Sequence, residues 1–125
     1  MERNHRRLPD SELEVMQALW RCKAPATRRE IEDVLLPERP MALTTLLTLL
    51  TRLAEKGFIR IEKTGRSSVY TPLVAQQDYL AGQSNRFFTQ LCGGNLHTFA
   101  AALCEGGLTR EELQELQKLL EEHAL

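Results

Sequence analysis

The stretch that decides the fold is "MALTTLLTLLTRLAEKGFI", residues 41–59. At about 100° per residue its leucines fall on one side of a helix, which is typical of a surface that faces a core. That side carries Leu46, Leu49, Leu50 and Leu53, flanked by Ala42, Leu43 and Ala54. The opposite side is rich in threonine, although this β-branched residue is a mediocre helix former. The pattern predicts a helix whose outer face is short, mostly uncharged and covered with hydroxyl and methyl groups.

The segments before this helix predict two further helices. Apolar residues recur at helical spacing from about Ser11 to Trp20, and Asp10 is the expected cap of this helix. After the break in "CKAPAT", Thr27 is the expected cap of a short helix that ends near Leu36.

The segment after the opening stretch predicts a β-hairpin. Gly57 stands where a left-handed residue commonly ends a helix. Aromatic and β-branched residues then flank the tip "KTGR", residues 63–66, as in a hairpin with a glycine-containing turn. Three helices followed by a hairpin is the order of a winged helix-turn-helix, and we expect this domain over residues 1–73.

The remaining residues, 74–125, predict three amphipathic helices separated by glycine pairs. Thr109 and Glu112 form an S/T-x-x-E capping box at the start of the last one. Three such short helices bury little core alone, so we expect a dimerisation domain that packs against a second copy of the chain. The fold class is therefore mostly α with a small β-hairpin wing. The expected homodimer interface comprises Leu80, Phe87, Phe88, Leu91, Leu96, Phe99, Leu103, Leu113, Leu116 and Leu120.

Composition and charge are typical of a globular protein with one basic half. The chain has 125 residues, of which 42% are hydrophobic and 26% charged. Residues 1–73 hold 13 lysines and arginines against 10 acidic residues, whereas residues 74–125 hold 3 against 7. Only the first half is thus suited to nucleic acid. No apolar run approaches the roughly 20 residues of a membrane span. Three cysteines do not form a disulfide framework, so we expect a cytoplasmic protein without membrane insertion.

The threonine face has the chemistry that a recognition helix needs in the major groove. Threonine can exchange hydrogen bonds with base edges, and its methyl group can contact a thymine methyl. A plain solvated surface is the alternative for such a face. We expect Thr44, Thr45 and Thr48 to read bases, with double-stranded operator DNA as the partner. Cationic side chains that can reach phosphates are Arg52, Arg28 with its neighbour Arg29, Lys63 and Arg66.

Other reactive residues give weaker patterns. Cys92, His97 and Cys104 fit no standard zinc spacing, and Cys22 beside Trp20 is expected in the core. The basic arm with Arg3, His5, Arg6 and Arg7 is either a tail or a contact to the DNA backbone. No set of side chains suggests catalysis, so we expect neither an enzyme nor a metal or cofactor.

Several motifs resemble those of the BlaI/MecI family of penicillinase repressors. They are "LPDSELEVMQALW", "LTTLLTLLTRLAEKGFI", "GRSSVYTPLV", "DYL" and "LTREELQELQKLLEEH", and together they run from Leu8 to about His123. The resemblance implies a cytoplasmic homodimer that represses transcription from a palindromic operator. It also implies that the recognition positions are Thr44, Thr45 and Thr48, with Leu47 where relatives often carry a basic residue.

The resemblance further implies a membrane sensor or its signalling protease as a partner, but the chain departs from that pattern. Relatives that respond to β-lactams are cut at an Asn–Phe bond, and the matching position here is near Ala101–Ala102. No Asn–Phe pair occurs in the chain, and neither do the paired C-x-C motifs of the copper-responsive branch. Two alternatives stay open. One is a thiol-, metal- or ligand-responsive regulator on the same fold, and the other is a winged-helix protein-interaction module without DNA binding.

Overall fold

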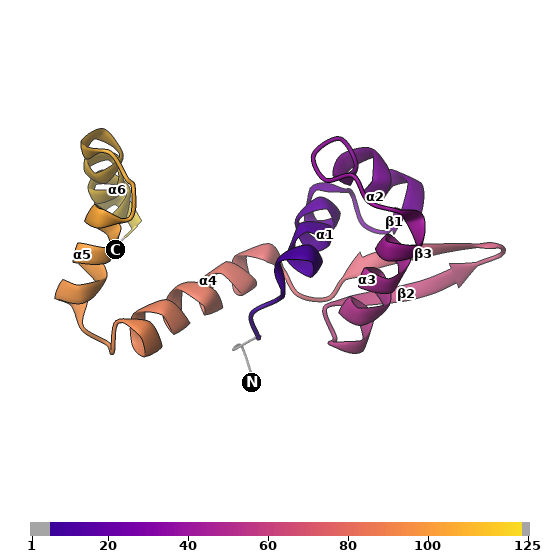
Figure 1. Cartoon of the computed structure of the whole chain (residues 1–125), viewed down its shortest axis with the longest axis horizontal. Helices are drawn as coiled ribbons and strands as arrows, with labels where there is room; N and C mark the ends of the chain where they lie inside the picture. The colour runs from indigo at the N-terminus through magenta and orange to yellow at the C-terminus, as the bar shows by residue number, and fades with distance from the viewer. Residues whose placement is uncertain (1–5, 124–125) are drawn as a thin grey trace. The chain divides into compact units, whose positions relative to one another are not determined.

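The computed structural model describes residues 6–123, which divide between two compact units, residues 1–83 and 84–125 (Figure 1). Arg3 and His5 of the expected basic arm lie outside the described residues. The first unit contains the three expected helices followed by the hairpin, so the predicted winged helix-turn-helix is confirmed. Its elements are α1 (Asp10–Arg21), β1 (Ala26–Thr27), α2 (Arg28–Leu35), α3 (Leu43–Glu55), β2 (Ile59–Thr64) and β3 (Ser67–Pro72).

The small sheet of the first unit has one strand more than the sequence predicted. The strand order is β1-β3-β2, and both pairings are antiparallel. Tyr70 in β3 lies opposite Ala26 on one side and Ile61 on the other. The segment around Ala26, which the sequence indicated only as a break, is therefore a strand that joins α2 to the hairpin.

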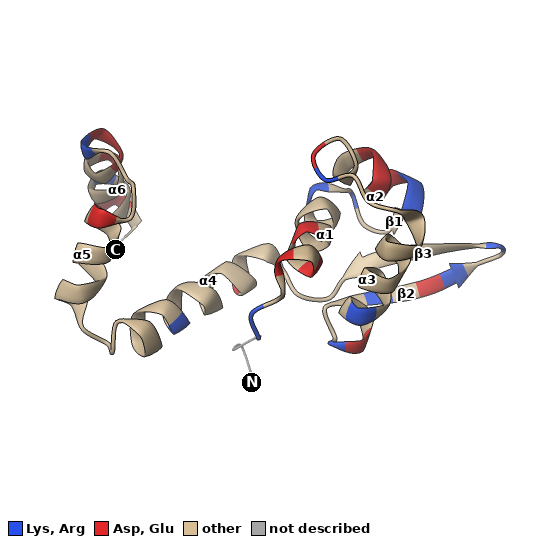
Figure 2. Cartoon of the chain, in the orientation of Figure 1, with Lys and Arg blue, Asp and Glu red and all other residues tan. Residues whose placement is uncertain are grey.

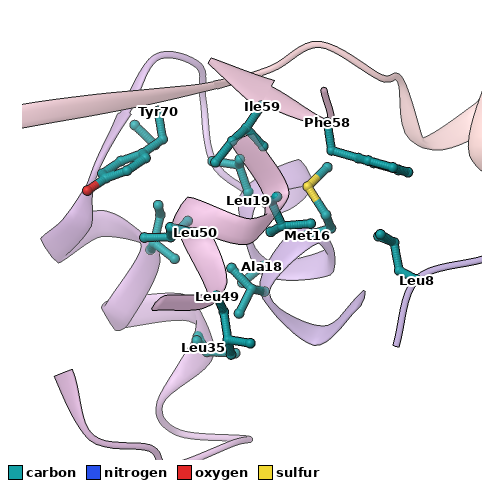
Figure 3. Close-up of a cluster of buried hydrophobic side chains, with 14 of the residues drawn as sticks. Leu8, Met16, Ala18, Leu19, Leu35, Leu49, Leu50, Phe58, Ile59 and Tyr70 are labelled. Atoms are coloured by element: carbon teal, nitrogen blue, oxygen red, sulfur yellow. The ribbon is translucent and has the colours of Figure 1, made fainter. Parts of the chain in front are cut away.

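The core of the first unit lies between the three helices and the root of the hairpin (Figure 3). The predicted inner face of α3 is confirmed, because its four leucines at 46, 49, 50 and 53 are all buried. They pack in one cluster with Met16 and Leu19 of α1 and with Phe58 and Tyr70. Leu43 was expected to flank this core, but it is 42% exposed because it lies in the first turn of α3, beyond the packed surface.

Of the two predicted N-caps, the one at α2 is found and the one at α1 is not. Thr27 caps α2 as predicted, since its Oγ1 accepts from the amide of Glu30 at 3.1 Å and the amide of Thr27 donates to Glu30 Oε1 at 2.8 Å. Asp10 does not cap α1. Pro9 occupies the cap position, and Asp10 lies inside the first turn, where a carboxylate interacts favourably with the helix dipole.

Gly57 ends α3 as predicted, with a left-handed φ of +82°. The amide of Phe58 donates to the carbonyl of Leu53 at 2.9 Å, and the amide of Gly57 donates to the carbonyl of Ala54 at 3.0 Å. These two hydrogen bonds define a Schellman motif. The motif turns the chain directly from α3 into β2 and so fixes where the hairpin begins.

The first unit extends beyond residue 73, where the sequence analysis placed the domain boundary. The helix α4 (Gln76–Arg86) begins in this unit, and Tyr79 in its first turn is buried. The hydroxyl of Tyr79 accepts from the amide of Leu8 at 2.9 Å, and Trp20 Nε1 donates to the carbonyl of Val74 at 2.9 Å. These contacts join residues more than 50 positions apart in sequence and complete the core.

The second unit contains a π-helical turn (Phe87–Leu91), α5 (Leu96–Glu105) and α6 (Arg110–His123). The first of the three helices expected in residues 74–125 is α-helical only to Arg86, and the widened turn follows it. Asn95 caps α5, and the predicted Thr109–Glu112 capping box at α6 is confirmed with hydrogen bonds of 3.0 and 2.9 Å. None of the helices in residues 6–123 is long and apolar enough to cross a membrane.

Candidate nucleic-acid interface

The outer face of α3 is fully accessible and carries no charge over its first two turns. Thr44, Thr45, Leu47 and Thr48 are all exposed, as the sequence predicted for a recognition surface, and Arg52 follows one turn later. A shallow hollow of about 350 Å³ lies on this face. It is lined by Leu47, Thr48, Thr51, Arg52 and Glu55. The short threonine side chains therefore leave room for base edges to approach the helix backbone.

Two threonines of this face form hydrogen bonds to the backbone of their own helix. Thr48 Oγ1 donates to the carbonyl of Thr44 at 2.9 Å, and Thr51 Oγ1 donates to the carbonyl of Leu47 at 3.0 Å. Such bonds to the preceding turn satisfy the hydroxyl hydrogen inside the helix. The outward surface of these two residues consequently offers a methyl group and oxygen lone pairs.

The beginning of α3 leaves backbone donors accessible. Ala42 occupies the cap position without a side-chain hydrogen bond, and the helical ladder starts with the amide of Leu46 bonded to the carbonyl of Ala42 at 3.0 Å. The amides of Leu43, Thr44 and Thr45 precede that first bond. Helix N-termini of this kind can bind phosphate through their amides and the positive end of the helix dipole.

The wing brings cations to a tip that is exposed throughout. Gly65 takes a left-handed φ of +68°, which allows the tight turn between β2 and β3. Lys63 and Arg66 flank it, and Figure 2 shows Lys and Arg at the end of the hairpin. Within residues 6–123 neither of these two side chains takes part in an ion pair. Their charges are thus available to phosphates.

The start of α2 adds a second basic site. Arg28 was singled out from sequence, but its Nε lies 3.9 Å from Glu32 Oε2 and so interacts with a neighbouring carboxylate. Arg29 is exposed and has no ion pair among the described residues, which makes it the stronger candidate for a phosphate. Thr27, immediately before them, pairs with Val69 of β3, so the sheet links this site directly to the wing.

The residues expected at a dimer interface lie in the helices α4 to α6 and are incompletely covered within one chain. Phe99 lies 5.7 Å from Phe87 and 5.5 Å from Phe88 between ring centroids, so these three rings pack within the chain. Among the described residues of the second unit only Cys92 is buried. The other expected positions, Leu80, Leu91, Leu96, Leu103, Leu113, Leu116 and Leu120, are exposed or half-buried.

The thiols and His97 are not gathered into a site. Within residues 6–123 no cluster of three or more His, Cys, Asp or Glu side chains could hold a metal ion. Cys104 and His97 are exposed, whereas Cys92 is buried. Cys22 is half-buried against the core, and burial, followed by the charge of Glu30, raises the pKa of its thiol. A raised pKa keeps a thiol protonated and weakens it as a nucleophile.

The fold and this exposed surface define a winged helix-turn-helix protein. The sequence profile of the Penicillinase repressor family matches residues 8–122, and the chain belongs to that family. It is 34% identical over 117 residues to the penicillinase repressor of Bacillus licheniformis, covering 93% of this chain and 91% of the relative. It is 29% identical to the methicillin resistance regulatory protein MecI of Mammaliicoccus sciuri, covering 90% and 92% of the two chains.

A solved structure supports the same assignment. The solution structure of the DNA-binding domain of the repressor BlaI is 34% identical to this chain and superposes with a TM-score of 0.51. The match covers 58% of this chain and 88% of that domain.

Proposed function

We propose that this protein is a homodimeric transcriptional repressor that binds a palindromic operator through α3 and the wing. The chain belongs to a repressor family, and the surface of its first unit supports the proposal most directly. An uncharged face of α3 suited to base edges is accompanied by the cations Arg29, Lys63 and Arg66, which form no ion pairs among the described residues. Phosphate contacts by these cations orient the protein, and the α3 face reads the sequence.

The test is a titration against two duplexes at two salt concentrations. One duplex is enriched by the protein from a random pool, and the other is its scrambled version. A repressor binds the enriched duplex more tightly, and its affinity falls steeply with salt because neutralised phosphates release counterions. A protein-interaction module instead shows little binding to either duplex at any salt concentration, and that result would reject the proposal.

The homodimer is proposed from the second unit. A unit in which only Cys92 is buried among the described residues cannot gain much stability from its own core. A groove of about 350 Å³ on α6 is lined by Leu113, Leu116 and Leu120, with Gln117 and Glu121 at its edge. A second copy of the same groove would cover these leucines by the isologous contact that is usual in dimers. Two half-sites would then lie about one helical turn, or a multiple of it, apart.

We propose two routes by which repression is relieved. We place the protein in the cytoplasm with its DNA, where a membrane sensor or its signalling protease could reach it, although the chain lacks the Asn–Phe bond. A thiol-responsive regulator on the same fold is the second candidate, because Cys104 is exposed. Cys22 does not support that candidate, since its raised pKa disfavours the reactive thiolate.

A further inference from the structure

The outer face of α3 contains two exposed leucines that no packing within the first unit explains. Leu43 is 42% and Leu47 is 39% exposed, and they stand one helical turn apart at the border of the outer face. Leu47 lies in the second turn of α3, whereas Leu43 is the first residue of this helix. In the uncharged face the neighbours of Leu47 are threonines, and it lines the shallow hollow of that face with Thr48 and Thr51.

Around Leu47 the hydroxyl hydrogens of this face are engaged within the helix. A hydroxyl has a single hydrogen, and those of Thr48 and Thr51 are used in hydrogen bonds to the carbonyls of Thr44 and Leu47. Leucine has no polar atoms. Guanine presents two acceptors in the major groove and is usually read by a donor with two hydrogens, such as arginine. The surface around Leu47 provides no such donor before Arg52 is reached.

The major groove does offer a partner for an apolar surface, namely the C5-methyl group of thymine. We infer that Leu47, together with the methyl group of Thr48, determines base preference by contacting thymine methyl groups in each half-site. This inference rests on the DNA-binding function proposed above and adds the base that this part of α3 selects. The contact is apolar, so it depends on the methyl group and hardly on the hydrogen-bonding edge of the base.

The test uses the duplex that the full-length protein enriches from a random pool. Each thymine is replaced in turn by deoxyuridine, which removes the methyl group and keeps every hydrogen-bonding atom. At one or two positions in each half-site we expect affinity to fall about three- to tenfold, which corresponds to one buried methyl group. At the same positions a C·G pair should be bound more tightly when its cytosine carries a 5-methyl group.

The contact is then assigned to its residue by a double-mutant cycle. Leu47→Ala should lose most of the discrimination between the thymine and uracil duplexes at the sensitive position, because only the methyl group of Thr48 remains to contact the base. Leu73→Ala, which removes an exposed leucine outside α3, should keep the full preference for thymine. Unchanged binding of both variants to scrambled DNA verifies that they are folded.

The possible failures can be told apart. If no duplex is enriched over the random pool, the proposed DNA-binding function is wrong and this inference fails with it. If a duplex is enriched but uracil is accepted at every position, or if Leu47→Ala keeps the full preference for thymine, the methyl contact of Leu47 is wrong while the repressor function stands.

Discussion

The ammonium group of Lys56 lies 2.6 Å from Oε1 of Glu12, whose side chain is only 4% exposed. Lys56 is the C-cap residue that directly follows α3, and Glu12 belongs to the first turn of α1. Glu12 is the buried charged residue of the described core, and this ion pair supplies its counter-charge. The pair therefore joins the C-terminal end of α3 to α1.

We expect Lys56→Met to lower the free energy of unfolding by about 1–3 kcal/mol, because the buried carboxylate loses its partner. Adding Glu12→Gln should recover part of this loss, since the remaining buried group is then neutral. The matched control is Arg21→Met, which removes an exposed ion pair 3.4 Å long between Arg21 and Glu38 and should change stability by less than about 0.5 kcal/mol. Urea unfolding measures all three variants, and equal effects of Lys56→Met and Arg21→Met would contradict the assignment.

The dimer proposal leads to a paired test on α6. Leu120 is 60% exposed and lines the leucine groove, whereas Leu119 is 43% exposed and lies in a different hollow with Glu115 and Lys118. Leu120→Asp should weaken dimerisation at least tenfold because it places a charge in a covered apolar contact, and Leu119→Asp should have little effect. Sedimentation equilibrium measures both. Phe87 and Phe99 are less suitable sites, since their contact at 5.7 Å belongs to the chain itself. A parent protein that is monomeric at micromolar concentration would rule out the dimer.

Substitutions on α3 and the wing should affect DNA binding in different ways. Thr45→Ala and Thr48→Ala should each weaken binding to the enriched duplex by about 1–3 kcal/mol and leave binding to scrambled DNA nearly unchanged. Arg66→Ala should weaken binding to both duplexes and reduce the salt slope by about one unit, because one phosphate contact is lost. Thr48→Val, which keeps a methyl group and removes the hydroxyl, separates the two contributions of that residue. Equal losses on both duplexes for Thr45→Ala would disprove base reading by that residue.

Much of the first unit could be predicted because its signals are local. The leucine period of α3, the Thr27 capping box and the left-handed Gly57 each depend on residues within about one turn of one another. The strand β1 was missed because two residues cannot show an alternating pattern, and its partner Val69 is 42 positions away from Thr27.

The unit boundary was missed for a related reason. Tyr79 looks like any residue of an amphipathic helix, and only its contacts with Leu8 and with the rings of Trp20 and Phe58 assign it to the first unit. At the candidate interface, sequence identified the threonines and Arg52 as exposed on α3 but placed Leu43 beside the core. It could not show that Arg28 is near Glu32 while Arg29 is without an ion pair in the described chain, because helical neighbours four residues apart pair only in some rotamers.

Cleavage at Ala101–Ala102 by a sensor that recognises Asn–Phe is not expected. The bond lies inside α5, none of whose residues is buried. Local opening of this helix therefore costs little free energy, and the helical structure alone would not protect the bond from a protease. Protection comes instead from the residues, because alanine has neither an amide nor a ring to fill a recognition pocket. In cells that contain such a sensor and are treated with a β-lactam, the mass of the chain should stay intact. The variant Ala101→Asn/Ala102→Phe should be cut there, and cleavage of the parent chain at the same bond would refute the prediction.

Cys22 should react slowly with alkylating reagents at neutral pH. Its Sγ lies 3.7 Å from the carbonyl oxygen of Glu30, and burial together with the Glu30 carboxylate raises the pKa of the thiol. Because the pKa is raised in the folded protein, the protonated thiol stabilises the fold at neutral pH. This stabilisation is lost as the pH rises from the pKa of an unfolded thiol, about 8.5, to the higher pKa of the folded protein. Iodoacetamide labelling followed by peptide mass spectrometry should therefore modify Cys22 more slowly than the same peptide when unfolded, with a rate that still increases above pH 9. Glu30→Gln is the informative variant, because glutamine can keep the capping bond to Thr27 while the negative charge is removed. It should lower the pKa and speed labelling, and a rate that is unchanged by Glu30→Gln and equal to that of the unfolded peptide would show that Cys22 is an ordinary exposed thiol.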